Sequence, residues 1–284
     1  MFVWLASYPK SGNTLVRSML SAYFFSKDGI YNFDLIKNIK QFPNAILFES
    51  LGLNIKNEKE LIKNYVKAQE FINKKNEIQF LKTHSHLFNI NGNIFTDLNN
   101  SLGAIYIVRD PRNIVSSLAT FLNISTTKSA DYLINGLQLG GNKNSNKKNE
   151  IIVTYSGIWN SNFDSWKSFK SNDKYLLIKY EDLIINKENT LKKILKFIYK
   201  LKNIKLEIDE SKLKNVIKST SFESMKNLEK EKSFPESQIN QETGKKIPFF
   251  NLGPKNDWKK LLDFEIIKKL EKAFAKEMKE LGYL

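Results

Sequence analysis

The chain has 284 residues, of which 41% are hydrophobic and 12% aromatic, and this composition is typical of a globular protein with one large core. It contains no cysteine, which excludes disulfides, thiolate nucleophiles and cysteine-ligated zinc. A net charge of +15 favours anionic ligands, but no stretch resembles a groove-binding motif, so a nucleic-acid partner is not expected. The sequence contains no apolar run of about 18 residues, so no membrane-spanning helix is predicted. We expect a cytoplasmic protein.

The first half of the chain alternates between predicted strands and helices. An apolar run at residues 2–7 predicts a strand, and residues 13–25 then place apolar side chains on one helical face. A helix is predicted at 58–72 and a strand at 78–82. The continuous apolar run at 103–108 is typical of a parallel strand covered on both faces, and Pro111 is suited to the first turn of the helix that follows.

The second half continues the same alternation. Its patterns predict a polar loop at 140–149, a helix at 150–170, a strand at 174–179 and a helix at 187–201. A polar stretch without periodicity follows at 228–256, and a last helix is predicted at 263–281. Strands that alternate with helices favour a central parallel β-sheet with helices on both faces. We find no internal repeat or linker, and therefore predict a single α/β domain over residues 1–284.

The loop between the first strand and the first helix has the composition of a phosphate site. Backbone N–H groups and the positive end of a helix converge at such a place. Within the loop, Gly12 allows close approach of the backbone, Lys10 brings a cation, and the hydroxyls of Ser11 and Thr14 can donate hydrogen bonds. The sequence therefore predicts an anion at the carboxyl end of the sheet.

This loop differs from the common nucleoside-triphosphate pattern G-x-x-x-x-G-K-[ST]. Ser7 stands where that pattern has its first glycine, and Asn13 stands where it has lysine. The lysine that reaches the β- and γ-phosphates of ATP is thus missing, which points to a nucleotide with one 5′-phosphate and a transferable group. A small-molecule kinase that uses ATP and Mg²⁺ stays as the alternative, and an ordinary turn as the plainest interpretation.

Residues Tyr8 to Thr14 resemble the 5′-phosphosulfate loop, Y-P-K-S-G-[TN]-[TS], of the PAPS-dependent sulfotransferases, whose domain has a P-loop NTPase-like fold. Four further segments are similar to motifs of that family and occur in the same order, at 80–84, 107–117, 179–183 and 220–226. The resemblance implies a transferase that moves a sulfuryl group from 3′-phosphoadenosine 5′-phosphosulfate (PAPS) to a hydroxyl or amine. The other product is adenosine 3′,5′-bisphosphate.

The resemblance also implies roles for individual residues. His84 is the expected general base, Lys10 neutralises charge on the leaving 5′-phosphate, and Lys82 orients the sulfuryl group or the acceptor. The expected cofactor-binding residues are Lys10, Ser11, Gly12, Asn13, Thr14, Arg109, Ser117, Tyr180, Thr220, Phe222, Gly253 and Lys255. Of these, Arg109 and Ser117 are assigned to the 3′-phosphate. No metal is expected, because His84 and His86 have no evident third ligand.

One segment departs from the family pattern. Residues 249–259 resemble F-x-R-K-G-x-x-G-D-W-K, but Asn251-Leu252 replaces the Arg-Lys pair that grips the 3′-phosphate. Lys255 is expected to compensate in part. The stretch 228–256 is interpreted either as a lid over the nucleotide or as a solvated, charged loop.

The sequence does not identify the acceptor, which is expected to be a small molecule, a lipid or a glycan. We expect segments 26–76 and 123–150 to shape its pocket. Four phenylalanines are placed either in an apolar acceptor pocket or in the core, namely Phe42, Phe48, Phe88 and Phe121. Oligomeric state is left open, with a homodimer among the options.

Overall fold

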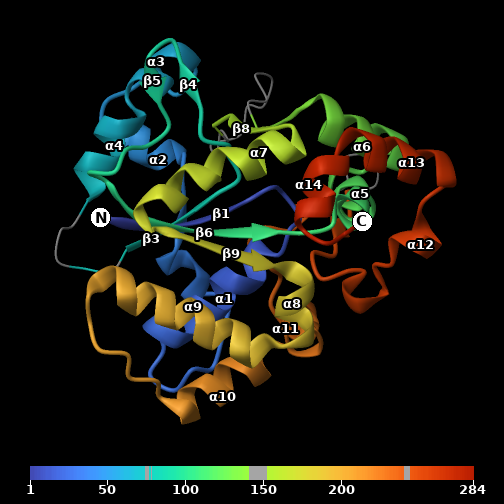
Figure 1. Cartoon of the computed structure of the whole chain (residues 1–284). Coiled ribbons are helices and arrows are strands. Elements are labelled where there is room, and N and C mark those ends of the chain that lie inside the picture. The colour runs from blue at the N-terminus through green and yellow to red at the C-terminus, as the bar shows by residue number, and fades with distance from the viewer. Residues whose placement is uncertain (74–76, 78, 141–151, 240–243) are drawn as a thin grey trace.

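The computed structural model describes residues 1–73, 77, 79–140, 152–239 and 244–284. Its centre is a five-stranded sheet in the order β2-β3-β1-β6-β9, and every neighbouring pair is parallel (Figure 1). In that order the strands are Lys40–Gln41, Gln79–Thr83, Phe2–Ser7, Ser101–Val108 and Tyr175–Lys179. The predicted α/β fold with a parallel sheet is confirmed.

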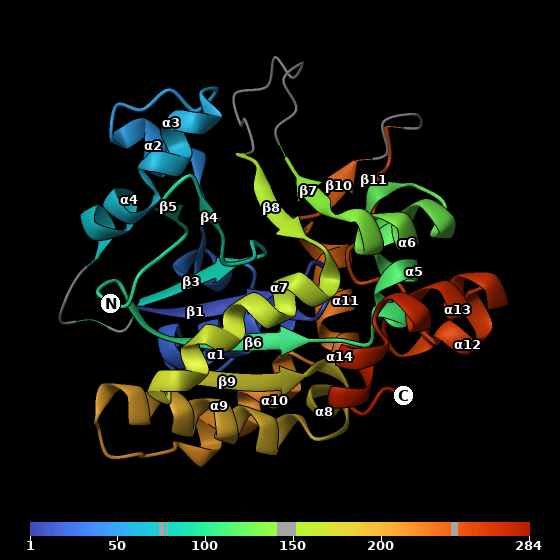
Figure 2. The ribbon, with the colours of Figure 1, turned by 45° about the horizontal axis from the view of Figure 1, so that its top comes forward.

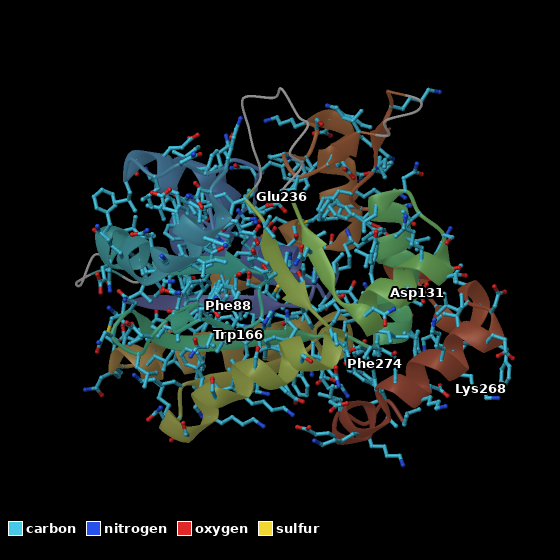
Figure 3. The ribbon with its side chains drawn as sticks, turned by 90° about the horizontal axis from the view of Figure 1, so that it is seen from above. Phe88, Asp131, Trp166, Glu236, Lys268 and Phe274 are labelled. Carbon is cyan, nitrogen blue, oxygen red and sulfur yellow. The ribbon has the colours of Figure 1, made fainter. Side chains whose placement is uncertain are left out.

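Alternation along the central strand divides the core into two layers. Trp4 and its neighbours at even positions pack into one cluster, whereas Val3 and Leu5 pack into the other. All six residues of β1 are buried, because helices cover both faces of a parallel sheet. Figure 3 labels Phe88 and Trp166, two members of the first cluster.

Helices that are far apart in the sequence share each face. The face below the sheet in Figure 1 carries α1, α8, α9, α10 and α11, at Asn13–Phe25, Tyr180–Ile185, Lys187–Lys202, Glu210–Ser219 and Phe222–Glu231, and the 3-10 turn η1 at Leu35–Asn38. The opposite face carries α2, α3, α4, α5, α6, α7, α12, α13 and α14, at Ala45–Ser50, Glu58–Lys63, Tyr65–Ile72, Pro111–Leu122, Thr126–Asn135, Trp159–Trp166, Trp258–Leu261, Phe264–Ala273 and Ala275–Glu280, and the 3-10 turn η2 at Lys167–Asn172. Within the residues described, none of these helices is long and apolar enough to cross a membrane.

Three short two-stranded pairs stand outside the main sheet. They are β4–β5 (Asn89–Ile90 and Asn93–Ile94), β7–β8 (Leu137–Leu139 and Thr154–Gly157) and β10–β11 (Gln238–Ile239 and Lys246–Ile247). Figure 2 shows β7–β8 and β10–β11 on the same side of the molecule, above the carboxyl ends of the central strands. These two pairs therefore stand over the edge where the first loop lies.

Four predicted elements need correction. The predicted helix 58–72 breaks at Asn64, whose side-chain amide donates to the carbonyl of Glu60. In the predicted helix 150–170, residues 150–151 lie outside the described part, and Thr154–Gly157 is a strand with alternating burial. The last predicted helix breaks at Phe274. The predicted irregular stretch 228–256 begins inside α11 and contains β10, β11 and the 3-10 turn η3 at Gly253–Lys255. Most of the predicted loop 140–149 lies outside the residues that the structure describes.

Candidate active site

A cavity of about 580 Å³ opens among the ends of the central strands. It is lined by the first loop, the end of β3, α5, α8, the start of α11 and the segment 247–256. The predicted site residues that line it are Lys10, Gly12, Asn13, Thr14, Lys82, His84, Arg109, Ser117, Tyr180, Thr220, Phe222 and Gly253. The structure thus brings residues from six separated segments of the sequence to one cavity.

The first loop is shaped by two residues with positive φ. Lys10 has φ of 67° and Gly12 has φ of 96°, and only glycine takes the left-handed region without a steric cost. Asn13 donates to the carbonyl of Leu5 at 2.9 Å and to Ser7 Oγ at 3.2 Å. The asparagine that replaces the usual lysine therefore ties the start of α1 back to the end of β1.

Lys10 lies between two aromatic rings at the cavity wall. Its Nζ is 4.4 Å from the ring centre of Phe121 and 4.5 Å from that of Phe249. Burial and the nearby charge of Arg109 lower the pKa of Lys10 to about 8. The ammonium group is therefore held by cation–π contacts. Hydrogen bonds to the oxygen atoms of a bound anion can replace these contacts.

Arg109 lines the cavity between the first loop and Tyr180. One of its NH groups donates to the carbonyl of Lys10 at 3.0 Å, and its guanidinium lies 4.3 Å from the ring centre of Tyr180. The adjacent carboxylate of Asp110 pairs with Arg112. Within the described residues, Arg109 Nε and Ser11 Oγ are buried without a hydrogen-bond partner. Buried donors of this kind indicate a missing acceptor.

His84 has a defined tautomer. Its Nδ1 lies 2.9 Å from the carbonyl oxygen of Ser7 and 3.1 Å from Ser7 Oγ. Because a carbonyl only accepts, Nδ1 carries the proton and Nε2 of the neutral ring is an acceptor. Burial and the charge of Lys82 hold the pKa of His84 well below its usual value, so the ring is neutral at pH 7.

Helix α7 holds the segment that carries His84, and sequence analysis missed this. Asn162 donates to the carbonyl of His84 at 3.0 Å, and Trp166 Nε1 donates to the carbonyl of Ser85 at 3.0 Å. Ser165 Oγ accepts from the amide of Leu87 at 3.0 Å. These residues lie three and four apart on α7, a spacing that indicated a shared face, but nothing in the sequence indicated what that face contacts.

The buried Lys82 and the half-buried Glu236 interact electrostatically and line the same cavity as His84. Lys82 is only 6% exposed and donates to Gln41 Oε1 at 2.8 Å, so it is not a surface lysine. Glu236, labelled in Figure 3, forms an ion pair with Arg17. Burial raises the pKa of Glu236, but the attraction of Lys82 and Arg17 outweighs it and leaves the pKa below its usual value. Burial lowers the pKa of Lys82 to about 8.

Two close contacts build the far wall of the cavity. A Cβ placed on Gly12 would lie 2.4 Å from Cδ2 of Tyr180, and one on Gly253 would lie 2.3 Å from Cζ of Phe222. Each glycine therefore lets an aromatic ring lie against the backbone. Lys187, which sequence analysis did not single out, also lines this cavity.

Of the remaining candidate residues, Phe121 lines the cavity and the others do not. Lys255 is exposed and does not line the cavity, and Ser11 is buried behind it. His86 lines a neighbouring pocket and hydrogen-bonds through Nδ1 to the carbonyl of Tyr155. Of the four phenylalanines, Phe42, Phe48 and Phe88 are in the core, whereas Phe121 lines the cavity. In the part of the chain that is described, no group of three or more metal-ligating side chains occurs.

Solved structures share this fold. Mouse sulfotransferase SULT7A1, in a crystal structure described as complexed with PAP, aligns over 98% of this chain and 83% of its own, with a TM-score of 0.58 and 18% identity. Retinol dehydratase, in a complex described as containing androsterone and the inactive cofactor PAP, aligns over 98% of this chain and 80% of its own, with a TM-score of 0.57 and 16% identity.

Sequence comparisons point the same way. Rat sulfotransferase 2A1 is 29% identical over 184 residues, a match that covers 61% of this chain and only 56% of that protein. Flavonol 3-sulfotransferase of Flaveria bidentis is 24% identical over 282 residues, or 99% of this chain and 82% of that protein. The family model described as the sulfotransferase domain matches residues 2–282. The chain therefore belongs to the sulfotransferase domain family.

Proposed function

We propose that this protein is a PAPS-dependent sulfotransferase that acts on a hydroxyl or amine group of a small organic acceptor. The observation that carries the proposal is one shared cavity: it contains the anion-binding loop around Lys10 and, facing the same space, the neutral imidazole of His84. A transferase for an anionic group needs both features side by side. Titration of the bisphosphate product and assay of transfer, described below, test it.

The residues present fit a bound adenosine 3′-phosphate 5′-phosphosulfate. Lys10, Thr14 and the first N–H groups of α1 would hold the 5′-phosphate. Arg109, with its unpaired Nε, and Ser117 would hold the 3′-phosphate. The rings of Tyr180 and Phe222 would border the nucleoside, together with Thr220 and Gly253. Asn251 and Leu252 line the cavity but bring no cation, which makes Arg109 the principal charge at the 3′-phosphate.

When bound, the cofactor supplies an electrophilic sulfuryl group for in-line transfer. The residues of this chain supply proton transfer and charge. His84 Nε2 would take the proton of the acceptor hydroxyl or amine, a general-base contribution of about 10²–10⁴-fold. Lys10 would neutralise negative charge on the leaving 5′-phosphate, and Lys82 would orient the sulfuryl group or the acceptor. Ser7 and Asn162 keep the imidazole in the tautomer and position that this requires.

Part of the cavity wall supports a mostly apolar acceptor. The cavity that His84 lines also includes Phe121, Leu122 and Leu139, with Thr154 as a polar residue. Apolar walls with a few polar groups are typical of sites for small organic ligands. A cytoplasmic location is part of the proposal, and it is supported by a relative named cytosolic sulfotransferase 17 of Arabidopsis thaliana, 24% identical over 182 residues.

Thermal unfolding with and without adenosine 3′,5′-bisphosphate tests the nucleotide. We expect Tm to rise with ligand concentration, and to rise less with ATP and Mg²⁺. Transfer of labelled sulfate from PAPS to a panel of phenols, aliphatic alcohols and amines then tests the reaction. Absence of a Tm shift at millimolar bisphosphate, or a Mg²⁺-dependent turnover of ATP, would contradict the proposal.

A further inference from the structure

Lys187 is a partly buried lysine that has no part in the proposed reaction. It is the first residue of α9 and lines the main cavity. Its Nζ donates to the carbonyl of Thr220 at 2.9 Å. Within the described residues, no carboxylate lies within ion-pair distance of it, although Lys192 on the same helix pairs with Glu188 and Glu210. Burial lowers the pKa of Lys187 to about 8, and among the residues that the structure describes no acid offsets this effect.

An ammonium group at a cavity wall needs more acceptors than one carbonyl. It has three N–H donors, and the hydrogen bond to Thr220 uses one of them. An unpaired charge that is partly buried costs free energy unless a partner arrives. The N–H donors that Thr220 does not use can therefore serve a ligand in the cavity that Lys187 lines.

Lys187 shares the cavity with apolar side chains, including Leu15, Ile184 and Phe222. Thr220, its hydrogen-bond partner, lies two residues before Phe222, and Ile184 lies three residues before Lys187. These side chains line the same cavity as Leu15. Arg109, by contrast, contacts Tyr180 and the loop carbonyl of Lys10. The two cations are therefore attached to different parts of the wall.

On the basis of the proposed function, we infer that Lys187 is a nucleotide-binding residue that donates a hydrogen bond to a ring nitrogen of the purine base. A purine has apolar faces for Phe222 and Leu15, and acceptor nitrogens on its edge for an ammonium group. The 3′-phosphate stays with Arg109. The base thus receives a charged donor from α9 in addition to the wall residues that the family motifs indicate.

Calorimetric titration of adenosine 3′,5′-bisphosphate and adenosine 5′-phosphate into the full chain tests this inference. Lys187→Met keeps the length of the side chain and removes its charge. A charge-assisted hydrogen bond contributes about 1.5–3 kcal/mol, so the variant should bind both nucleotides roughly 10- to 100-fold more weakly. The ratio of the two dissociation constants should stay as in wild type, since both ligands have the same base.

Two further variants complete the experiment. Lys193→Met removes an exposed lysine of the same helix and should leave both dissociation constants unchanged. Lys187→Arg retains a charged donor and should bind more tightly than Lys187→Met. Unchanged binding by Lys187→Met would overturn the inference, as would weakening confined to the bisphosphate, which would place Lys187 on the 3′-phosphate. If wild type itself does not bind the bisphosphate, the proposed function fails first.

Discussion

Arg109 offers the sharpest test of how the nucleotide is held, because the Arg-Lys pair of the family is absent and Arg109 has an unpaired donor in the cavity wall. Arg109→Met removes the guanidinium and keeps an unbranched side chain. Hydrogen bonds to charged groups contribute about 1.5–3 kcal/mol each. A fork that makes two of them to one phosphate should contribute about 3–6 kcal/mol, or roughly 10²- to 10⁴-fold in dissociation constant.

The loss should depend on the ligand. Calorimetric titration should show that wild type prefers adenosine 3′,5′-bisphosphate over adenosine 5′-phosphate, and that Arg109→Met loses most of this preference. Arg109 also donates to the carbonyl of Lys10, so some weakening toward both nucleotides is expected. Arg109→Lys, which keeps the charge without the planar fork, should recover only part of the preference. A preference that survives in Arg109→Met would refute the assignment of the 3′-phosphate to this residue.

Three other predictions follow from the site. His84→Ala should lower the rate of sulfuryl transfer by about 10²–10⁴-fold and change the dissociation constant of the bisphosphate by less than about threefold; equal turnover in mutant and wild type would exclude the base role. Gly12→Ala should lower both Tm and nucleotide affinity, because a Cβ there meets Tyr180 at 2.4 Å at a φ of 96°, and left-handed backbone alone costs about 1–2 kcal/mol; unchanged affinity would contradict it. Lys10 and Lys82 have pKa values of about 8, and a bound anion raises these values, so nucleotide binding at pH 8 to 9 should be accompanied by proton uptake. Calorimetry in buffers of different ionisation enthalpy measures this uptake, and proton release on binding would contradict the prediction.

The sequence predicted the elements whose patterns are local. The apolar runs at 2–7 and 103–108 became β1 and β6, and the loop between β1 and α1 lies at the cavity as expected. The strand Thr154–Gly157 was missed because four residues next to a helix pattern give little periodicity. Breaks at Asn64 and Phe274 were missed for a related reason, since the apolar spacing continues across both.

Contacts between distant segments were beyond the sequence patterns. The hydrogen bonds from α7 to the residues around His84 join positions about 78 apart, and no local rule indicates such a pairing. The same holds for Glu236 beside Arg17. Lys187 could not be singled out among the many lysines, because its environment, and not its spacing, distinguishes it.

A crystal structure of the protein with adenosine 3′,5′-bisphosphate measures the central claim most directly. The account predicts the 5′-phosphate within hydrogen-bond distance of Lys10 Nζ and the amides at the start of α1, with Nε2 of His84 facing it across the space where an acceptor would lie. A bisphosphate bound elsewhere, or a 5′-phosphate turned away from His84, would contradict the account.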